Sequence, residues 1–381
     1  MANKNIDIVK AAAMTPGPNG RWGLPILIEG EPGIGKTSII ESEVSKASGL
    51  HQETVIASLR EPADFLGFPI ITDGTMSYAP AQWVSRVCKK ARAIVFMDEL
   101  NTAPPSVQAA LLRVVLDGAV GDVQLPPGVR FIAAQNATED AAGGWDLSAP
   151  LANRFGHLKW DAPDLESWSA WLLGESTSTK SKIKAADLEA EVMRQWPDAW
   201  AKARGLVSGF LRKRPDLLQQ MPGADSPDRS KAWPSARSWE NATRALASSY
   251  VHGMDEDTAH AFMSAFIGTE TAYEFNVWMS EADLPDPIEV LDGKVTFKHN
   301  PYRLDITAAV LNACVGYVTP EDAVNRAERT EKLWEIIAEL STDAADLVIS
   351  PIKALSKAKL AKTKQARKVL AKFSHIFGAV S

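Results

Sequence analysis

The chain has 381 residues, of which 45% are hydrophobic and 23% are charged, and its formal net charge is −6. This composition is ordinary for a soluble globular protein of about two or three domains, and the negative balance argues against a protein that binds nucleic acid with its whole surface. Two widely separated cysteines, Cys88 and Cys314, exclude a disulfide framework and favour a reducing, cytoplasmic location. We expect neither a signal peptide nor a membrane span, because no apolar run has the required length and flanks.

Short apolar runs alternate with helical patterns in the N-terminal part of the chain, which predicts an α/β fold with a parallel sheet. The predicted strands are Pro25–Glu29, Thr54–Ala57, Ala93–Met97, Phe131–Gln135 and His157–Trp160. Between them lie helical patterns long enough to cross over from one parallel strand to the next, at Lys36–Ser48, Pro80–Lys90 and Ser106–Leu116.

A glycine-rich loop follows the first predicted strand. The stretch GEPGIGKT, Gly30–Thr37, fits the pattern G-x-x-x-x-G-K-[ST] in full. Glycines let the backbone curl so that its N–H groups point at phosphate oxygens, and the following helix adds its positive end. Lys36 would reach the β- and γ-phosphates of ATP, and the Thr37 hydroxyl would bind Mg²⁺. The predicted nucleotide contacts are Gly30, Glu31, Pro32, Gly33, Ile34, Gly35, Lys36, Thr37 and Ser38.

The strand Ala93–Met97 ends in two acids, Asp98 and Glu99. Parallel strands deliver their carboxyl ends to one edge of a sheet, so these acids should lie near the phosphate loop. Asp98 would hold Mg²⁺, usually through water, and Glu99 would polarise the attacking water.

These motifs, with later segments, resemble the AAA+ ATPases, and within them the MoxR family. The segments that carry the resemblance keep the family's order: REPADFLGFPI (Arg60–Ile70), MDELNTAPPSVQAALLRVVLDG (Met97–Gly118), FIAAQN (Phe131–Asn136), LSAPLANRFGHL (Leu147–Leu158) and WPSARSWENATRAL (Trp233–Leu246). The resemblance covers about residues 20–250 and implies a P-loop NTPase core, a helical lid and ATP hydrolysis with Mg²⁺.

The resemblance also implies roles for three further residues. Asn136 would be the sensor-1 residue, which orients the attacking water together with Glu99. Arg154 would be the arginine finger, which reaches the γ-phosphate bound by a neighbouring subunit. Arg237 would be the sensor-2 arginine, although Arg244 on the same helical pattern competes for that role.

Two segments depart from the family pattern. The acidic strand of MoxR proteins is usually followed by Asn-Arg, whereas here the pair is Asn101-Thr102. The stretch after sensor 1 is usually proline-rich and acidic, whereas Ala137–Pro150 carries two adjacent glycines, which predicts a loop geometry of its own.

Two extended runs within Gly67–Trp83 are joined by Asp73-Gly74, which is a hairpin signal. In this clade of AAA+ proteins the resemblance implies a hairpin that points towards a central pore. Phe68 and Tyr78 are aromatic groups that could grip a partner there, although such residues more often pack the hairpin itself. Gly118–Gly128 is a second candidate pore loop.

Amphipathic helical patterns dominate the chain beyond Trp160. We therefore predict an α/β AAA+ core over residues 1–162, an all-α lid over 163–290 and a mostly helical C-terminal extension over 291–381. The segment Lys353–Lys372 contains seven lysines, one arginine and no acidic residue. This pattern predicts either a solvated helix face or a docking surface for an acidic partner or a nucleic acid.

The resemblance implies a homo-oligomer, a hexameric ring, that remodels or activates a client protein complex together with a partner that has a von Willebrand factor A-type domain. One alternative is an AAA+ motor that acts on nucleic acid. Another is a nucleotide-gated switch with negligible turnover, against which the intact Lys36, Asp98, Glu99 and Asn136 argue.

Overall fold

The computed structural model describes residues 4–137, 144–173 and 184–374. The packing groups the chain into two units, Met1–Arg194 with Gln219–Ala272, and Gln195–Leu218 with Tyr273–Ser381. Residues 219–272 thus pack with the α/β part of the chain. The functional division predicted at residues 162 and 290 stays a prediction.

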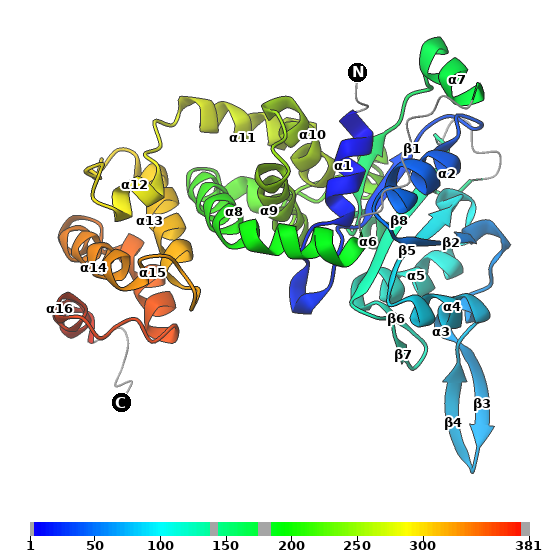
Figure 1. The fold of residues 1–381 in the computed structure, drawn as a ribbon, viewed down its shortest axis with the longest axis horizontal. Helices are drawn as coiled ribbons and strands as arrows, with labels where there is room; N and C mark the ends of the chain where they lie inside the picture. Colours follow the sequence, from blue (N-terminus) through cyan, green and yellow to red (C-terminus); the bar gives the residue numbers. More distant parts are fainter. Residues whose placement is uncertain (1–3, 138–143, 174–183, 375–381) are drawn as a thin grey trace. The chain divides into compact units, whose positions relative to one another are not determined.

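A five-stranded parallel sheet in the order β2-β5-β8-β1-β9 forms the centre of the first unit (Figure 1). Its strands are β1 (Ile26–Glu29), β2 (His51–Ile56), β5 (Arg92–Asp98), β8 (Gly128–Gln135) and β9 (Gly156–Lys159). All eight residues of β8 are buried, as expected for a central strand with both faces covered. The five predicted strands and the α/β fold class are confirmed.

Helices surround this sheet, and the core between them contains large side chains such as Phe65, Trp83 and Phe155. The helices of the α/β part are α1 (Lys4–Ala13), α2 (Lys36–Ile39), α3 (Ala63–Leu66), α4 (Gln82–Lys90), α5 (Pro105–Asp117), α6 (Ala149–Ala152) and α7 (Leu165–Leu172). The predicted helix after the phosphate loop is present, and a π-helical segment, Ile40–Lys46, continues α2. Proline at the first position of α5 and Gly118 in the left-handed region after its end set the limits of that helix.

The predicted hairpin is present as β3 (Phe68–Thr72) and β4 (Thr75–Ala79). Asp73 and Gly74 both have positive φ, as a two-residue hairpin turn with the twist of the strands requires. A shorter hairpin, β6 (Ala119–Val120) and β7 (Val123–Gln124), packs against its base, where the Tyr78 N–H donates to Asp122 Oδ2 over 2.9 Å. A Cβ atom on Gly121 would lie 2.9 Å from the Leu66 carbonyl oxygen, so this contact requires glycine.

Two further helices of the first unit are α9 (Ala236–Val251) and α10 (Glu256–Ile267). The helix α8 (Ala185–Lys213) begins in the first unit and ends in the second, and α11 (Thr269–Glu281) does the same. The helical C-terminal part predicted from the sequence is confirmed.

The described residues of the second unit form helices and connecting loops, with a core that includes Cys314, Val318 and Trp334. Its remaining helices are α12 (Pro287–Leu291), α13 (Leu304–Val318), α14 (Arg326–Asp343), α15 (Ala345–Lys357) and α16 (Lys364–Lys372). All seven lysines of Lys353–Lys372 are exposed, as a solvated surface requires. Within the described ranges, no helix is both long and apolar enough to cross a bilayer.

Candidate active site

The loop Gly30–Gly35 connects β1 to α2 at the carboxyl edge of the sheet. Gly33 and Gly35 have φ values of +82° and +84°, in the left-handed region that glycine adopts without strain. The loop therefore has the curled backbone that the motif predicts, and it ends at the N-terminus of the α2 helix.

Lys36 is the most enclosed cation of this loop, with 8% of its surface exposed. Its Nζ donates to the Gly30 and Glu31 carbonyl oxygens over 2.8 and 2.9 Å and to Asn136 Oδ1 over 2.9 Å. Burial lowers the pKa of Lys36, and the neighbouring Asp98 carboxylate offsets part of that effect. A phosphate oxygen that binds this ammonium would replace one of the three oxygens.

Thr37 and Asp98, the two predicted magnesium ligands, lie in direct contact. The Thr37 hydroxyl donates to Asp98 Oδ2 over 2.7 Å. Hydroxyl and carboxylate oxygens suit Mg²⁺, which uses few protein ligands and completes its shell with water and phosphate. This donor pair therefore fits Mg²⁺. The described residues contain no cluster of three or more His, Cys, Asp or Glu side chains that could hold a metal.

Glu99 occupies a turn directly after β5, with φ +56° and ψ +45°. Its Oε2 accepts a hydrogen bond of 2.6 Å from the Ser58 hydroxyl. Ser58 lies in a short 3-10 turn, Ala57–Leu59, at the end of the adjacent strand β2. The sequence analysis missed Ser58; the signal available was its place after a parallel strand that ends at the same edge.

Asn136 follows β8 and joins the same group through two contacts. Its side chain accepts from Lys36, and its backbone oxygen accepts from Asn101 Nδ2 over 2.9 Å. Asn101, 3% exposed, appeared in the sequence analysis only as part of a departure from the family pattern. We call Lys36, Thr37, Asp98, Glu99 and Asn136 the phosphate-loop edge, since the structure brings all five together with the loop.

Arg154 lies at the opposite edge of the sheet. It precedes β9, which runs parallel to β1, whereas the phosphate loop follows the end of β1. Its guanidinium donates to the Pro150 carbonyl oxygen, and its buried Nε has no hydrogen-bond partner among the described residues. The fold therefore does not bring Arg154 to the phosphate loop of its own chain.

Arg237 is the second residue of α9, and the N-cap of that helix, Ser235, donates a hydrogen bond to the side chain of Asn153, which precedes Arg154. Burial lowers the pKa of Arg154 most, the positive charge of Arg237 lowers it further, and Asp117 offsets part of the effect. The competing candidate, Arg244, donates to the Pro16 carbonyl oxygen over 2.8 Å and to Glu240 over 3.0 Å. We call Arg154 and Arg237 the arginine pair.

The sequence of this region matches a known family. Residues 25–156 match the profile of the ATPase family associated with various cellular activities (AAA). Residues 25–156 therefore form an AAA-type ATPase domain. The matched residues of this AAA domain include the whole phosphate-loop edge and Arg154, whereas Arg237 lies outside them.

Two individual proteins are also similar to this chain. Midasin from Giardia intestinalis is 28% identical over 167 residues, which are 40% of this chain and 3% of midasin, so the chain spans a small fraction of that protein. The crystal structure of a protein from Cytophaga hutchinsonii, described as an ATPase, covers 74% of this chain and 89% of its own, with 16% identity and a TM-score of 0.44.

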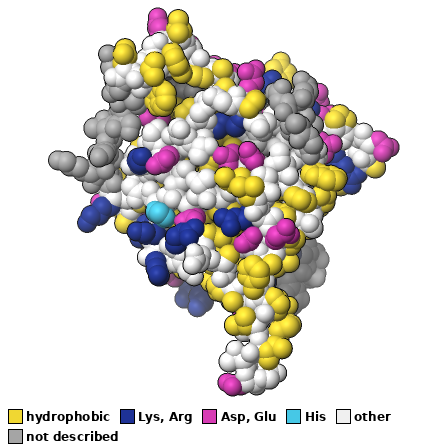
Figure 2. Space-filling view, turned by 90° about the vertical axis from the view of Figure 1, so that its right-hand side faces the viewer, with side chains coloured by type: hydrophobic (Ala, Val, Ile, Leu, Met, Phe, Trp, Pro, Cys, Tyr) yellow, Lys and Arg dark blue, Asp and Glu magenta, His cyan; other side chains and the backbone are white. Residues whose placement is uncertain are grey.

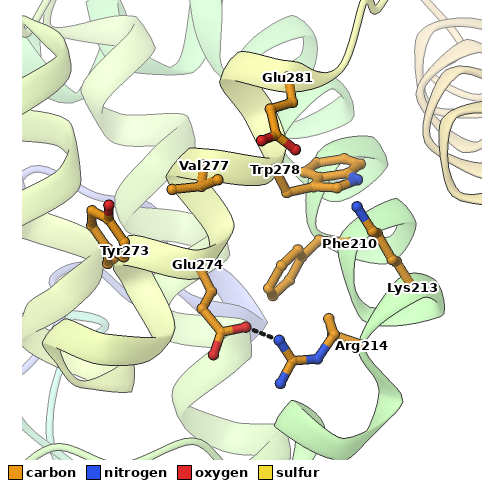
Figure 3. A pocket seen from close by; sticks show the side chains of 8 residues that line it. All are labelled: Phe210, Lys213, Arg214, Tyr273, Glu274, Val277, Trp278 and Glu281. Atoms are coloured by element: carbon orange, nitrogen blue, oxygen red, sulfur yellow. Dashed lines mark hydrogen bonds and ion pairs between the residues drawn. The ribbon is translucent and has the colours of Figure 1, made fainter.

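A pocket of about 220 Å³ lies within the second unit (Figure 3). Aromatic and charged side chains line it, with Arg214 paired to Glu274 and the Trp278 indole held by Asp305 over 2.7 Å. None of the predicted site residues lines this pocket. The loop predicted at Ala137–Pro150 falls partly outside the described residues, which lack 138–143.

Proposed function

We propose that this chain is a MoxR-type AAA+ ATPase that converts ATP to ADP and phosphate in order to remodel a client protein. The observation that carries the proposal is the presence of two hydrogen-bonded pairs, Lys36 with Asn136 and Thr37 with Asp98, at the end of a glycine-rich loop. A cation, a hydroxyl, a carboxylate and a neutral amide at one sheet edge match the needs of phosphoryl transfer, which depends on positioning and charge stabilisation.

Each residue of the phosphate-loop edge has a separate task in this proposal. The loop N–H groups and Lys36 bind the triphosphate, while Thr37 and Asp98 would hold Mg²⁺. Bound Mg²⁺ would offset negative charge on the transferred group. Glu99 leaves its hydrogen bond with Ser58, accepts a proton from the attacking water and orients that water together with Asn136.

The arginine pair would act on the nucleotide of a neighbouring subunit. Four residues of β1 separate the edge that holds Arg154 from the phosphate loop, a distance of about 13 Å at the usual rise of a strand. Asn153, next to Arg154, accepts a hydrogen bond from Ser235 at the start of the helix that carries Arg237, so both cations can serve one anion. The resemblance implies the γ-phosphate of the neighbour for Arg154, and we assign the same phosphate to Arg237. Head-to-tail contacts of this kind generate a closed ring, here a hexamer.

The β3–β4 hairpin would contact the client. Pro69, Ile71, Met76 and Tyr78 share one face of it, and Ile71 is 80% exposed. Figure 2 shows the hairpin as a mostly hydrophobic projection. An apolar projection of this kind suits transient contacts with exposed chain segments, which supports a chaperone-like role. The von Willebrand factor A-type partner is proposed from the resemblance alone.

Mixing two inactive variants tests the shared site. Lys36→Ala disrupts the phosphate-loop edge and keeps the arginine pair. Arg154→Ala disrupts the arginine pair and keeps the phosphate-loop edge. In randomly assembled rings about a quarter of the interfaces combine both intact halves, so mixing should restore about a quarter of the wild-type turnover. Wild-type protein that hydrolyses ATP as a monomer, or mixtures that stay inactive while both variants assemble, would contradict the proposal.

A further inference from the structure

We infer that Asn153 is a positioning residue: its side chain joins the segment of Arg154 to the start of α9, which carries Arg237, so that both guanidinium groups can serve one phosphate of the neighbouring subunit. This inference rests on the proposed function. It adds a determinant of turnover that touches neither nucleotide nor metal.

The Asn153 side chain joins the segment of Arg154 to the segment of Arg237. Its Nδ2 donates to the Trp233 carbonyl oxygen over 3.2 Å, and its Oδ1 accepts from the Ser235 hydroxyl over 2.8 Å. Asn153 and Ser235 are each 5% exposed, so water does not compete for these bonds. Asn153 directly precedes Arg154, and Ser235 lies two residues before Arg237.

A second set of bonds fixes the start of α9. The Ser235 hydroxyl accepts from the Ser238 N–H over 3.1 Å, and the Ser238 hydroxyl accepts from the Ser235 N–H over 2.7 Å. This reciprocal arrangement is a capping box, which sets the direction in which the helix leaves. Ser238 also donates to the Trp233 carbonyl oxygen over 2.9 Å, so the segment that carries Arg237 has little freedom to shift.

The Arg154 side of the joint is anchored as well. Leu151 and Phe155, on either side of Asn153 and Arg154, are 0% and 1% exposed in the core of the first unit. The backbone at Arg154 is therefore fixed relative to the sheet. The two hydrogen bonds of the Asn153 amide then link this fixed backbone to the start of α9.

Charge explains why this joint is needed. Like charges repel, and the positive charge of Arg237 lowers the pKa of Arg154, so holding the two segments together works against this repulsion. The Asn153 bonds resist separation of the two segments and keep both cations in place before a phosphate arrives. Preorganised charges do not have to be brought together during the reaction, and this is what makes such groups effective in catalysis.

The residue type follows from the two bonds. Asparagine donates to a carbonyl and accepts from a hydroxyl with one side chain. Aspartate could accept from Ser235 but could not donate to Trp233, and alanine could do neither. We therefore test Asn153→Ala, with Ser235→Ala as a milder variant that keeps the Trp233 contact.

The matched control is Ser248→Ala. Ser248 is also a buried serine of α9, and its hydroxyl accepts from the Thr15 hydroxyl of a distant segment over 2.9 Å. Ser248 belongs to neither the arginine pair nor the phosphate-loop edge. Ser235→Ala and Ser248→Ala each remove one buried hydroxyl, and Ser235→Ala also removes the N-cap of α9, so turnover of the two variants is compared at temperatures equally far below their unfolding midpoints.

The steady-state measurement is kcat and KM for ATP, with thermal unfolding and oligomer mass for each variant. We expect Asn153→Ala to lower kcat by about 30-fold, in the range that small misplacements of catalytic groups produce, with KM changed less than about twofold. Ser235→Ala should lower kcat about fivefold and Ser248→Ala less than about twofold. The inference is overturned if Asn153→Ala or Ser235→Ala assembles and turns over like wild type, or if Ser248→Ala lowers kcat as much as Ser235→Ala.

Mixed rings locate the defect. Asn153→Ala should be rescued by Lys36→Ala, whose arginine pair is intact, and should not be rescued by Arg154→Ala. Rescue by Arg154→Ala would overturn the inference, because Asn153 would then support the phosphate-loop edge rather than the arginine pair. If Arg154→Ala itself keeps full turnover, the proposed function fails; if Arg154→Ala is inactive and both joint variants are normal, the inference on Asn153 fails alone.

Discussion

Lys36 and Arg154 are both partly enclosed cations of the AAA domain, but their surroundings differ. Lys36 donates to three oxygens of its own chain, two from the loop backbone and one from Asn136. Arg154 has one backbone acceptor, a buried Nε without a partner among the described residues, and a second arginine nearby.

This contrast shows which half of the site is complete in a single chain. In the phosphate-loop edge Lys36 is paired with Asn136 and Thr37 with Asp98, so its polar groups have partners within the chain. The arginine pair holds excess positive charge, which an anion from outside the chain would neutralise. A protein that carries the phosphate-loop edge and Arg154 on opposite edges of one sheet is suited to head-to-tail assembly.

The largest expected effect is at the arginine pair. Arg154→Ala should lower kcat by about 10³-fold, at the lower end of the range known for arginine fingers. Arg154→Lys should recover only a small part, because lysine keeps the charge and lacks the planar fork of donors. Steady-state ATPase rates at a protein concentration that assembles rings measure this. Full turnover by Arg154→Ala would show that the phosphate-loop edge does not need the arginine pair for ATP hydrolysis.

Glu99→Gln tests the phosphate-loop edge. We expect kcat to fall by about 100-fold or more, because an amide cannot accept the proton of the attacking water. ATP binding, measured with a fluorescent analogue, should remain within about threefold of wild type, since Glu99 has no predicted contact with the phosphates. Equal losses in binding and turnover would show that the turn of Glu99 supports the loop rather than the chemistry.

Ser58→Ala sharpens the account of Glu99. The hydrogen bond of 2.6 Å from Ser58 holds the carboxylate before it takes its catalytic position. Without that bond, basal turnover should rise about threefold, which is less than one hydrogen bond to a charged group is worth. Ser58→Thr, which keeps the hydroxyl, is the control. A lower rate in Ser58→Ala would mean that Ser58 orients Glu99 for catalysis.

The smallest expected effect concerns nucleic acid. Duplex DNA should change turnover by less than about twofold at 50 mM salt, because the net charge is −6 and the exposed lysines of Lys353–Lys372 are not part of the AAA domain. Stimulation that falls steeply with added salt would revive the alternative of a nucleic-acid motor. Charge reversal at Lys357 and Lys364 would then show whether this segment carries the binding.

The sequence predicted the five parallel strands, the phosphate loop and the β3–β4 hairpin, and the structure has each of them. These features depend on short local patterns: apolar runs, a spaced set of glycines, and a two-residue turn with positive φ. The sequence did not predict the hydrogen bond from Ser58 to Glu99 or the bonds of Asn153. Those contacts join side chains 41 and 82 residues apart, and a serine or an asparagine has no local pattern that announces a distant partner.

By itself the sequence determined that a phosphate-binding loop and an acidic pair would meet at one sheet edge, because parallel strands carry their carboxyl ends to the same side. Tertiary structure alone decided that Arg154 lies at the opposite edge. The hydrogen bond between Ser235 and Asn153 joins the start of α9 to the segment between α6 and β9, which carries Arg154, and the length of β1 separates that segment from the phosphate loop of the same chain.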